Sequence, residues 1–380
     1  MKLRTAIIVL LGIVLATGLV FAGGQADRGA TGRDQDAIRI GVAGAHSGDL
    51  ASYGLPTVNA AELVVATYND RGGINGRRVQ LFVEDDQCAP EVAANTAAKL
   101  VSDRVVAVIG HICSGATNTA LPTYEAERIV AISPSATSPG LADYANFYRT
   151  IAPDDAQGAL QVQFVLNQLG LSRVAVLHDR GDYGKGLADF ALEYLNEASG
   201  VEVVLYDGIT VGAVDYSAII NRIAAQRAEI VFWGGYHPEA SKLVDQMRNR
   251  GMDTLFISGD GIKDDTFINV AGRAAEGVYA TGARSTEGNT LAEEYSRKHT
   301  EKYGSEPGPF FQEAVSATIA LLNAIEKAGS TDYQAIMNAL QSEYVETPVG
   351  RISFDETGNA IGVGFVVYQV QNLEFVQVSE

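Results

Sequence analysis

The sequences VIGHICSG, at residues 108–115, and ISPSATSPG, at residues 132–140, share one pattern that decides the fold. Each begins as an apolar run suited to a buried strand, then changes to small, hydroxyl-bearing residues where a helix can begin. In an open parallel sheet, the carboxyl ends of neighbouring strands border a ligand-binding crevice. Backbone N–H groups at a helix start favour an anion. The two stretches therefore predict a carboxylate-binding cleft rather than a reaction centre.

Apolar strands alternate with longer amphipathic segments on both sides of these stretches. We expect strands at 38–44, 79–84, 105–110 and 129–133, and helices at 56–69, 91–102 and from about residue 116. This βαβαβαβ succession predicts a mostly parallel, doubly wound sheet.

A second α/β series begins near residue 153. Its expected helices are 156–169, 183–198, 216–226 and 238–250, and its expected strands are 173–178, 201–206, 230–233 and 254–258. After about residue 282, three successive helices (291–303, 309–328, 333–341) precede strands at 351–354, 363–369 and 375–378. We expect these helices to cover the first domain and the last strands to cross to the second. Two lobes joined by several crossings form a hinge architecture.

Residues 1–22 have the pattern of a signal peptide. A basic start precedes an almost wholly apolar run over residues 6–20, and Val20 and Ala22 fit a cleavage site before residue 23. The run is somewhat short for a membrane span, and an uncleaved membrane anchor is the alternative. The Gly-, Asp- and Arg-rich segment 23–36 predicts a loose, flexible mature N-terminus.

The mature chain is expected to be strongly acidic. Removing Lys2 and Arg4 with the signal leaves 26 basic (28 − 2) against 46 acidic side chains, a formal charge of −20. This charge argues against nucleic-acid binding, which needs a basic footprint, and suits a soluble protein outside the cytoplasm. Cys88 and Cys113 fit an exported protein with one disulfide, and reactive thiols are the alternative.

The sequence lacks the patterns of common catalytic and metal sites. The histidines at 46, 111, 178, 237 and 299 do not have metal-ligand spacing, so we expect structural or surface roles. No phosphate-binding or dinucleotide-binding glycine motif follows the first strand, and Ser114 lacks the glycines of a nucleophile elbow. Asp85 and Asp86 are expected to be solvated loop residues. We expect no cofactor, no metal and no enzymatic activity.

Several segments resemble the type I periplasmic binding proteins specific for branched-chain amino acids, close to the leucine/isoleucine/valine-binding protein. They are GAHSGDLASYG (44–54), NDRGGINGRRVQLFVEDDQC (69–88), IGHICSGAT (109–117), SPSATSP (133–139), DRGDYGKG (179–186) and GGYHPE (234–239). The resemblance implies an α/β fold of two Rossmann-like, doubly wound lobes joined by a multi-strand hinge. The implied lobes are 37–154 with 284–358, and 155–283 with 359–380.

The resemblance also assigns polar contacts to a ligand. Ser114 and Thr137 would each donate from the hydroxyl and the backbone N–H to its carboxylate. The Ser135 carbonyl would accept from its ammonium, and Ala136 would shape the turn between them. Taken alone, Ser114 and Thr137 would be interpreted as helix caps, and their place within the matched motifs reverses that preference. The resemblance implies further that Cys88 and Cys113 form the disulfide that holds the loop of Ser114.

The remaining implied site residues are an acid and a set of aromatic walls. Asp260, in FISGDGIKDD (256–265) and next to Gly261, would face the ammonium where the family pattern has glutamate. A turn residue is the plainer interpretation of Asp260. The side-chain pocket would be walled by aromatic residues that could otherwise be ordinary core or surface residues, namely Tyr53, Phe310, Tyr183 and Tyr236.

Together these features predict a receptor of an ABC importer rather than an enzyme. We expect a monomer in the periplasm that binds leucine, isoleucine or valine, closes about its hinge and delivers the ligand to a membrane permease. One alternative keeps the fold but binds an amide, urea, or a polar or aromatic amino acid. Another is a secreted hydrolase of small amides, for which the sequence offers no nucleophile–base pair.

Overall fold

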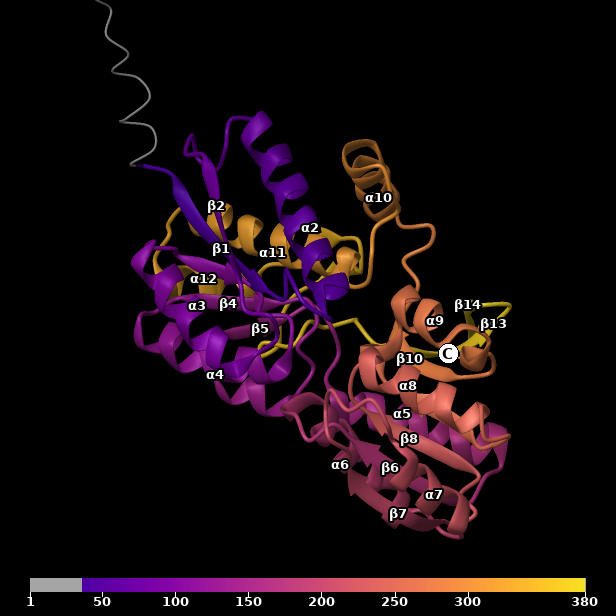
Figure 1. Ribbon diagram of the computed structural model, residues 1–380. Coiled ribbons are helices and arrows are strands. Elements are labelled where there is room, and N and C mark those ends of the chain that lie inside the picture. The colour runs from indigo at the N-terminus through magenta and orange to yellow at the C-terminus, as the bar shows by residue number, and fades with distance from the viewer. Residues whose placement is uncertain (1–35, 380) are drawn as a thin grey trace, which may run out of the picture.

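Two α/β lobes make up the protein in the computed structural model, which describes residues 36–379 (Figure 1). The expected signal peptide, and the expected loose segment up to residue 35, lie outside the described residues. Within residues 36–379, no helix has the length and apolar character needed to cross a membrane.

The first lobe is built on parallel strands in the order β2-β1-β3-β4-β5. These are β1 Ile38–Gly44, β2 Val79–Asp85, β3 Ala107–Ile109, β4 Val130–Ser133 and β5 Phe147–Arg149. Its helices are α2 Ala51–Asp70, α3 Pro90–Ser102 and α4 Ser114–Ala126, followed by a 3-10 turn, Pro139–Asp143.

Alternate strand residues pack against helices on opposite faces of this sheet. Ile38 and Ile40 share a core with α2 and with the late helix α11 (Phe311–Ala328). Val108 and Ala131 point to the other face and pack against α3 and α4. Because helices cover both faces, the strands are apolar on both sides and give nearly continuous apolar runs in the sequence.

The second lobe has strands in the order β14-β13-β10-β9-β8-β6-β7, of which β13 and β14 are antiparallel. They are β6 Arg173–His178, β7 Glu202–Gly208, β8 Ile230–Gly234, β9 Leu255–Ser258, β10 Tyr279–Ala283, β13 Phe365–Gln371 and β14 Glu374–Ser379. One face carries α5 Asp154–Phe164, continued by a π-helical turn, Val165–Leu169, and α6 Asp182–Glu197. The other carries α7 Ser217–Ala225, α8 His237–Arg248 and α9 Asp265–Ala271, with 3-10 turns at Asp260–Ile262 and Gly272–Ala275.

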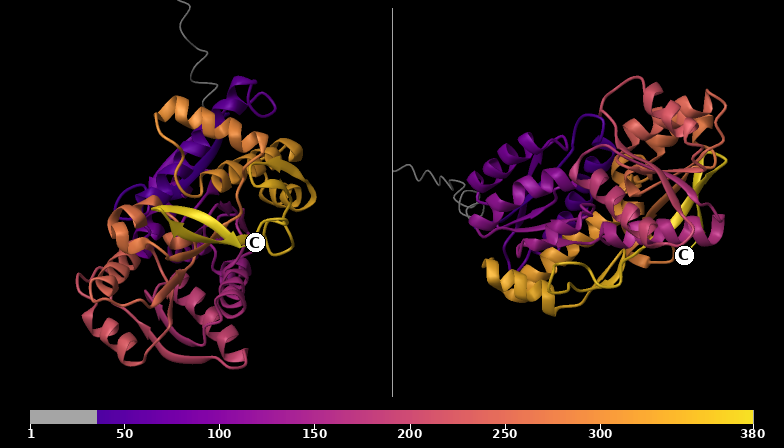
Figure 2. Two further views of the ribbon diagram at one scale, coloured as in Figure 1. Left: turned by 90° about the vertical axis from the view of Figure 1, so that its right-hand side faces the viewer. Right: turned by 90° about the horizontal axis from the view of Figure 1, so that it is seen from below.

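The late helices and the last two strands divide between the lobes (Figure 2), whereas the expected strand at 351–354 stays with the first lobe, because Ile352 and Phe354 pack in its core. α10 (Thr290–Tyr303), α11 and α12 (Tyr333–Ser342) contribute to the core of the first lobe, while β13 and β14 complete the second sheet. A separate hairpin joins β11 Val345–Thr347 to β12 Gly350–Ile352. The chain crosses between the sheets at 150–153, 284–289 and 353–364, and parts of all three crossings line one space. The expected fold class is confirmed.

Helix α2 begins earlier than its sequence pattern indicates. It starts at Ala51, ahead of the expected residue 56, and Pro56 lies inside it. Because proline is common at the first helical position, Pro56 is predicted from the sequence to begin the helix. Gly54 allows the added first turn, because a Cβ there would lie 1.9 Å from the Ala45 carbonyl oxygen.

Four short elements, β5, α9, β10 and β11, were not expected from the sequence. β5 has three residues and one of them is Arg149, so it carries no apolar run. β10 is held between β9 and β13, and β13 lies far along the chain. Such segments are ordered by tertiary pairing, which a local pattern does not record.

The expectation that Asp86 is a solvated loop residue is wrong. The side chain is fully buried, and its Oδ2 lies 2.5 Å from Nδ1 of the buried His111. Its Oδ1 accepts a hydrogen bond from the Cys88 N–H at 2.8 Å. The left-handed backbone at Gln87 and Cys88 turns the chain back over this carboxylate. Asp86 therefore ties the end of β2 to the loop after β3.

The implied disulfide between Cys88 and Cys113 is present, with the two Cα atoms 5.5 Å apart. Cys88 follows β2, and Cys113 immediately precedes α4, whose first residue is Ser114. The disulfide therefore fixes the start of α4 to the end of β2, a strand that β1 separates from β3 in the sheet.

Replacing both cysteines, as Cys88→Ser with Cys113→Ser, is expected to lower the free energy of unfolding by about 3 kcal/mol. The reason is that the reduced unfolded chain gains the freedom of the 25-residue loop. Urea unfolding of the oxidised protein and the double variant measures the difference. An unchanged midpoint with an unchanged slope would contradict a stabilising disulfide.

Candidate functional site

The candidate site lies at the carboxyl ends of both sheets. Strand order reverses between β1 and β3 in the first lobe and between β6 and β8 in the second. Open α/β sheets bind ligands at such switch points. The expected site residues occupy the loops and helix starts after these strands and after β4 and β9. The exception is Phe310, which precedes α11.

Ser114 is the first residue of α4, and no side chain caps this helix. The Ser114 hydroxyl instead accepts a hydrogen bond from the Ser138 N–H at 3.2 Å, so it joins the loop after β4 to the helix. The helix-cap alternative for Ser114 is therefore wrong. The first backbone N–H groups of any α-helix have no partner inside the helix, so the start of α4 can donate to an anion.

The loop after β4 is held by two buried polar side chains. The Ser133 hydroxyl donates to the His111 carbonyl oxygen at 2.5 Å and accepts from the Ala136 N–H at 2.9 Å. The Arg149 guanidinium donates to the carbonyl oxygens of Thr137 and Ser138, each at 2.9 Å. These hydrogen bonds occupy the Thr137 and Ser138 carbonyl oxygens and fix the backbone of the loop before a ligand binds.

Asp260 supplies a buried carboxylate from the second lobe. Its Oδ1 accepts a hydrogen bond from the Tyr183 hydroxyl at 2.8 Å, and that hydroxyl accepts from the Gly261 N–H at 3.0 Å. Gly261 has to be glycine, because a Cβ there would lie 2.7 Å from the Tyr183 ring. Burial raises the pKa of Asp260 to about 6, although the Tyr183 hydrogen bond opposes this shift.

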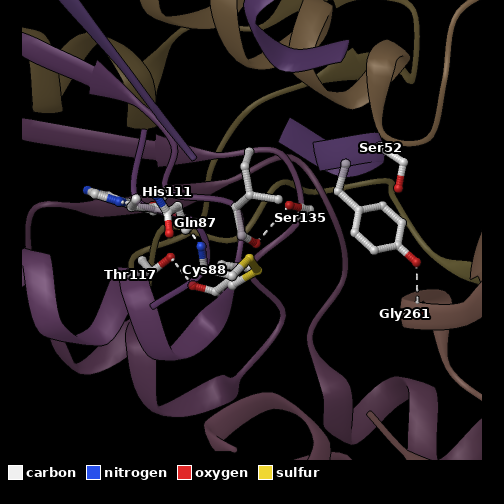
Figure 3. Close-up of a disulfide and its surroundings, with 12 residues drawn as sticks. Ser52, Gln87, Cys88, His111, Thr117, Ser135 and Gly261 are labelled. Carbon is white, nitrogen blue, oxygen red and sulfur yellow. Dashed lines mark hydrogen bonds and ion pairs between the residues drawn. A yellow bond between two sulfur atoms is a disulfide. The ribbon is translucent and has the colours of Figure 1, made fainter. Parts of the chain in front are cut away.

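Aromatic rings from both lobes enclose the space beside Asp260. The Tyr53 hydroxyl donates to the Gly261 carbonyl oxygen at 2.8 Å, a bond that joins the two lobes (Figure 3). The Tyr53 ring centroid lies 5.4 Å from that of Phe310 and 6.3 Å from that of Tyr236. Tyr183 lies 5.0 Å from Tyr236. The rings form one continuous apolar wall that crosses between the lobes.

These residues line one small pocket between the lobes. Its lining contains most of the expected site residues together with Ile112, namely Tyr53, Ile112, Ser135, Tyr183, Tyr236, Asp260, Gly261 and Phe310. Ser114, Ala136 and Thr137 are buried beside it in the same loops but do not line it. The structure thus brings residues from seven separate segments of the sequence to one place.

The sequence pattern missed Asp154 and Gln157, at the start of α5. Asp154 is fully buried, its N–H donates to the Thr137 carbonyl oxygen at 3.0 Å, and neither carboxylate oxygen has a hydrogen-bond partner among the described residues. Burial, with the nearby charge of Asp260, raises the pKa of Asp154 well above its ordinary value. An acid in the first turn of a helix is common, so only its burial distinguishes it.

Unpartnered polar atoms gather around this point. The Thr137 hydroxyl, the Asp154 carboxylate and the Gln157 Nε2 are all buried without hydrogen-bond partners in the described part of the chain. Buried polar groups in native proteins are almost always satisfied by protein, water or a ligand. The arrangement can therefore bind a polar molecule, with donors on the first lobe and carboxylates on the other side.

The chemistry of the site involves hydrogen bonding, charge and apolar contact. Residues 36–379 contain no group of three or more His, Cys, Asp or Glu side chains arranged to hold a metal ion.

Comparisons with known proteins agree with this geometry. Residues 37–374 match a family described as "Periplasmic binding protein". A Leu-, Ile-, Val-, Thr- and Ala-binding protein of Pseudomonas aeruginosa is 34% identical over 336 residues, which cover 88% of this chain and 90% of the relative.

Two solved structures show the same fold over most of their length. A leucine-binding protein of Thermotoga maritima has a TM-score of 0.84 and 26% identity, covering 90% of this chain and 98% of that one. A branched-chain amino acid substrate-binding protein of Streptococcus pneumoniae, in complex with isoleucine, has a TM-score of 0.80 and 27% identity, covering 90% and 100%. From its sequence, its two-lobed fold and these matches, the chain belongs to the periplasmic binding protein family.

Proposed function

We propose that this chain is the extracytoplasmic solute receptor of an ABC importer, binds leucine, isoleucine or valine between its lobes and delivers it to a membrane permease. The relatives support this proposal, because several that match over most of the chain are named for these amino acids. The site supports it independently, because its two walls carry complementary polar groups around an apolar space.

The observation that carries the proposal is that the buried Asp260 shares one pocket with aromatic rings from both lobes and with Ser135, whose loop is joined to the start of α4. A zwitterion loses water from both charged ends when it enters such a space, so each end needs a fixed partner. The start of α4 suits a carboxylate and Asp260 suits an ammonium. The rings of Tyr53, Tyr183, Tyr236 and Phe310 suit an apolar side chain. An L-α-amino acid with a branched aliphatic side chain meets all three requirements.

We assign the polar contacts as follows. The N–H and hydroxyl groups of Ser114 and Thr137 bind the ligand carboxylate, and Ala136 shapes the turn between Ser135 and Thr137. The Ser135 carbonyl and Asp260 bind the ammonium. Asp154 places a second buried carboxyl group near Asp260, and the two raise each other's resistance to ionisation until a cation is bound.

The proposal extends to domain organisation and location. The lobes comprise residues 37–154 with 284–358 and residues 155–283 with 359–380, and they close about the three crossings when the ligand binds. Closure matters because a permease distinguishes loaded from empty receptor only if the two forms differ in shape and free energy. Residues 1–22 direct export to the periplasm, where the mature chain acts as a monomer.

A thermal-shift screen tests the proposed ligand class. Leucine, isoleucine and valine, each at a hundredfold excess over its dissociation constant, should add about 2.7 kcal/mol of stability to the folded protein. Leucinamide and 4-methylpentanoate, which each lack one charged end, and D-leucine serve as matched controls and should stabilise far less. Stabilisation by urea or acetamide in place of the three amino acids would contradict the proposal.

The variant Asp260→Asn is expected to weaken leucine binding by about 1–3 kcal/mol, because it removes the charge that faces the ammonium. Isothermal titration calorimetry measures the change. Asp265→Asn, an equal loss of charge at an exposed position in α9, is the control and should bind as tightly as the original protein. An unchanged affinity in Asp260→Asn would remove this residue from the site.

Leucine affinity is expected to fall as the pH is lowered through about 6. The ammonium binds the ionised form of Asp260, whose pKa is raised to about 6, so at pH 5 only about a tenth of the sites carry that charge. Calorimetry at pH 7 and pH 5 should show a roughly tenfold difference. Asp260→Asn should lose this dependence, and if it keeps the same dependence another group is responsible.

A further inference from the structure

We infer that Ser52, Asp264 and His237 form a latch between the lobes that sets how long the closed form lasts. Ser52 lies in the first turn of α2, in the first lobe. Asp264 caps the start of α9, and His237 is the first residue of α8, both in the second lobe. The Ser52 hydroxyl donates a hydrogen bond to Oδ2 of Asp264. This contact lies outside the ligand-lining residues.

The two oxygens of the Asp264 carboxylate accept hydrogen bonds from different lobes. Oδ1 accepts from the Thr266 N–H at 2.8 Å, which caps α9 within the second lobe. Oδ2 points to Ser52 in the first lobe. Asp264 is only 5% exposed, so separating the lobes would replace the Ser52 bond by water. The bond between Ser52 and Asp264 can therefore exist only when the lobes are together.

His237 shields this hydrogen bond and connects it to the ligand wall. Its Nε2 lies 3.5 Å from the Ser52 hydroxyl and 3.7 Å from Oδ2 of Asp264. Its ring meets the Tyr53 ring edge-on, with centroids 5.4 Å apart. Tyr53 itself reaches across to Gly261, and Figure 3 shows Ser52 beside the tyrosine bonded to Gly261. The latch and the aromatic wall therefore adopt their closed positions together.

The three residue types are those of a hydrolytic triad, but their geometry does not fit that role. In a triad the carboxylate orients the histidine through the ring nitrogen that does not face the serine. Here Ser52 donates to the carboxylate directly, and Nδ1 of His237 is buried without a hydrogen-bond partner among residues 36–379. Ser52 and Asp264 are therefore positioning residues for closure.

The chain contains a matched control for this bond. The Ser47 hydroxyl donates to Oδ2 of Asp85 at 2.5 Å, and both residues belong to the first lobe. Ser47→Ala therefore removes a serine–aspartate hydrogen bond that does not cross between the lobes. Asp264→Asn keeps a residue that also caps helices well, so α9 should retain its start.

The first test measures leucine dissociation by stopped-flow fluorescence in the mature protein, and it rests on the proposed function. Ser52→Ala and Asp264→Asn should each raise the dissociation rate on the order of tenfold, because a hydrogen bond to a charged group is lost. The association rate should change little. The double variant should dissociate no faster than either single variant, and Ser47→Ala should match the original protein. Unchanged dissociation in Ser52→Ala, or multiplying effects in the double variant, would overturn the latch.

A second test needs no ligand. Ser52→Cys with Asp264→Cys should cross-link under mild oxidation, with an intact mass lower by two hydrogens and a smaller radius of gyration in X-ray scattering. Ser47→Cys with Asp264→Cys is the control and should not cross-link. If leucine fails to bind the original protein while the cross-link forms in the double-cysteine variant, the proposed ligand is wrong and the latch stands. If the Ser52 and Asp264 pair does not cross-link, the latch is wrong whichever ligand binds.

Discussion

Two carboxyl groups that are buried near each other without an ion-pair partner, Asp260 and Asp154, impose the main physical constraint on this protein. Neither forms an ion pair within residues 36–379. The guanidinium of the nearby Arg149 donates its hydrogen bonds to backbone carbonyl oxygens and to Asn359. Burying charge without a partner is costly, and raised pKa values are the usual response. A site built this way favours a ligand that brings its own positive charge.

The first lobe supplies hydrogen-bond donors for the negatively charged end of a ligand. Because β3 and β4 end side by side, the start of α4 and the loop at 135–138 lie next to each other, and the Ser114 hydroxyl joins them. The disulfide and the Asp86–His111 pair hold the loop between β3 and α4 against the end of β2. The donors for a carboxylate are thus held by bonds inside one lobe, and no reorganisation is needed when a ligand arrives.

Contacts between the lobes are few and specific. Tyr53 reaches Gly261, Ser52 reaches Asp264, and on another edge Asn118 donates to Asp182 at 3.1 Å. In each of these hydrogen bonds, water could take the place of the partner if the lobes separated. A ligand shifts the balance between closed and separated forms only by as much as its affinity for the two forms differs.

The sequence alone determined the alternation of strands and helices, the doubly wound sheets and the hydroxyl-rich ends of β3 and β4. It also placed the late helices on the first lobe and the last strands in the second. Buried parallel strands and amphipathic helices produce strong local periodicity, so these features are visible without coordinates. The resemblance to a known family, carried by short motifs, supplied the disulfide and the aromatic walls.

Only the tertiary structure decided which polar residues are buried. Asp86, Asp154 and Asp264 each follow a strand or begin a helix, where acids are commonly solvated. Their burial depends on segments far along the chain, such as α2 covering Asp264 and the 135–138 loop covering Asp154. Local pattern sets the period of an element, whereas the environment of a single charge is set by whatever the whole fold packs against it.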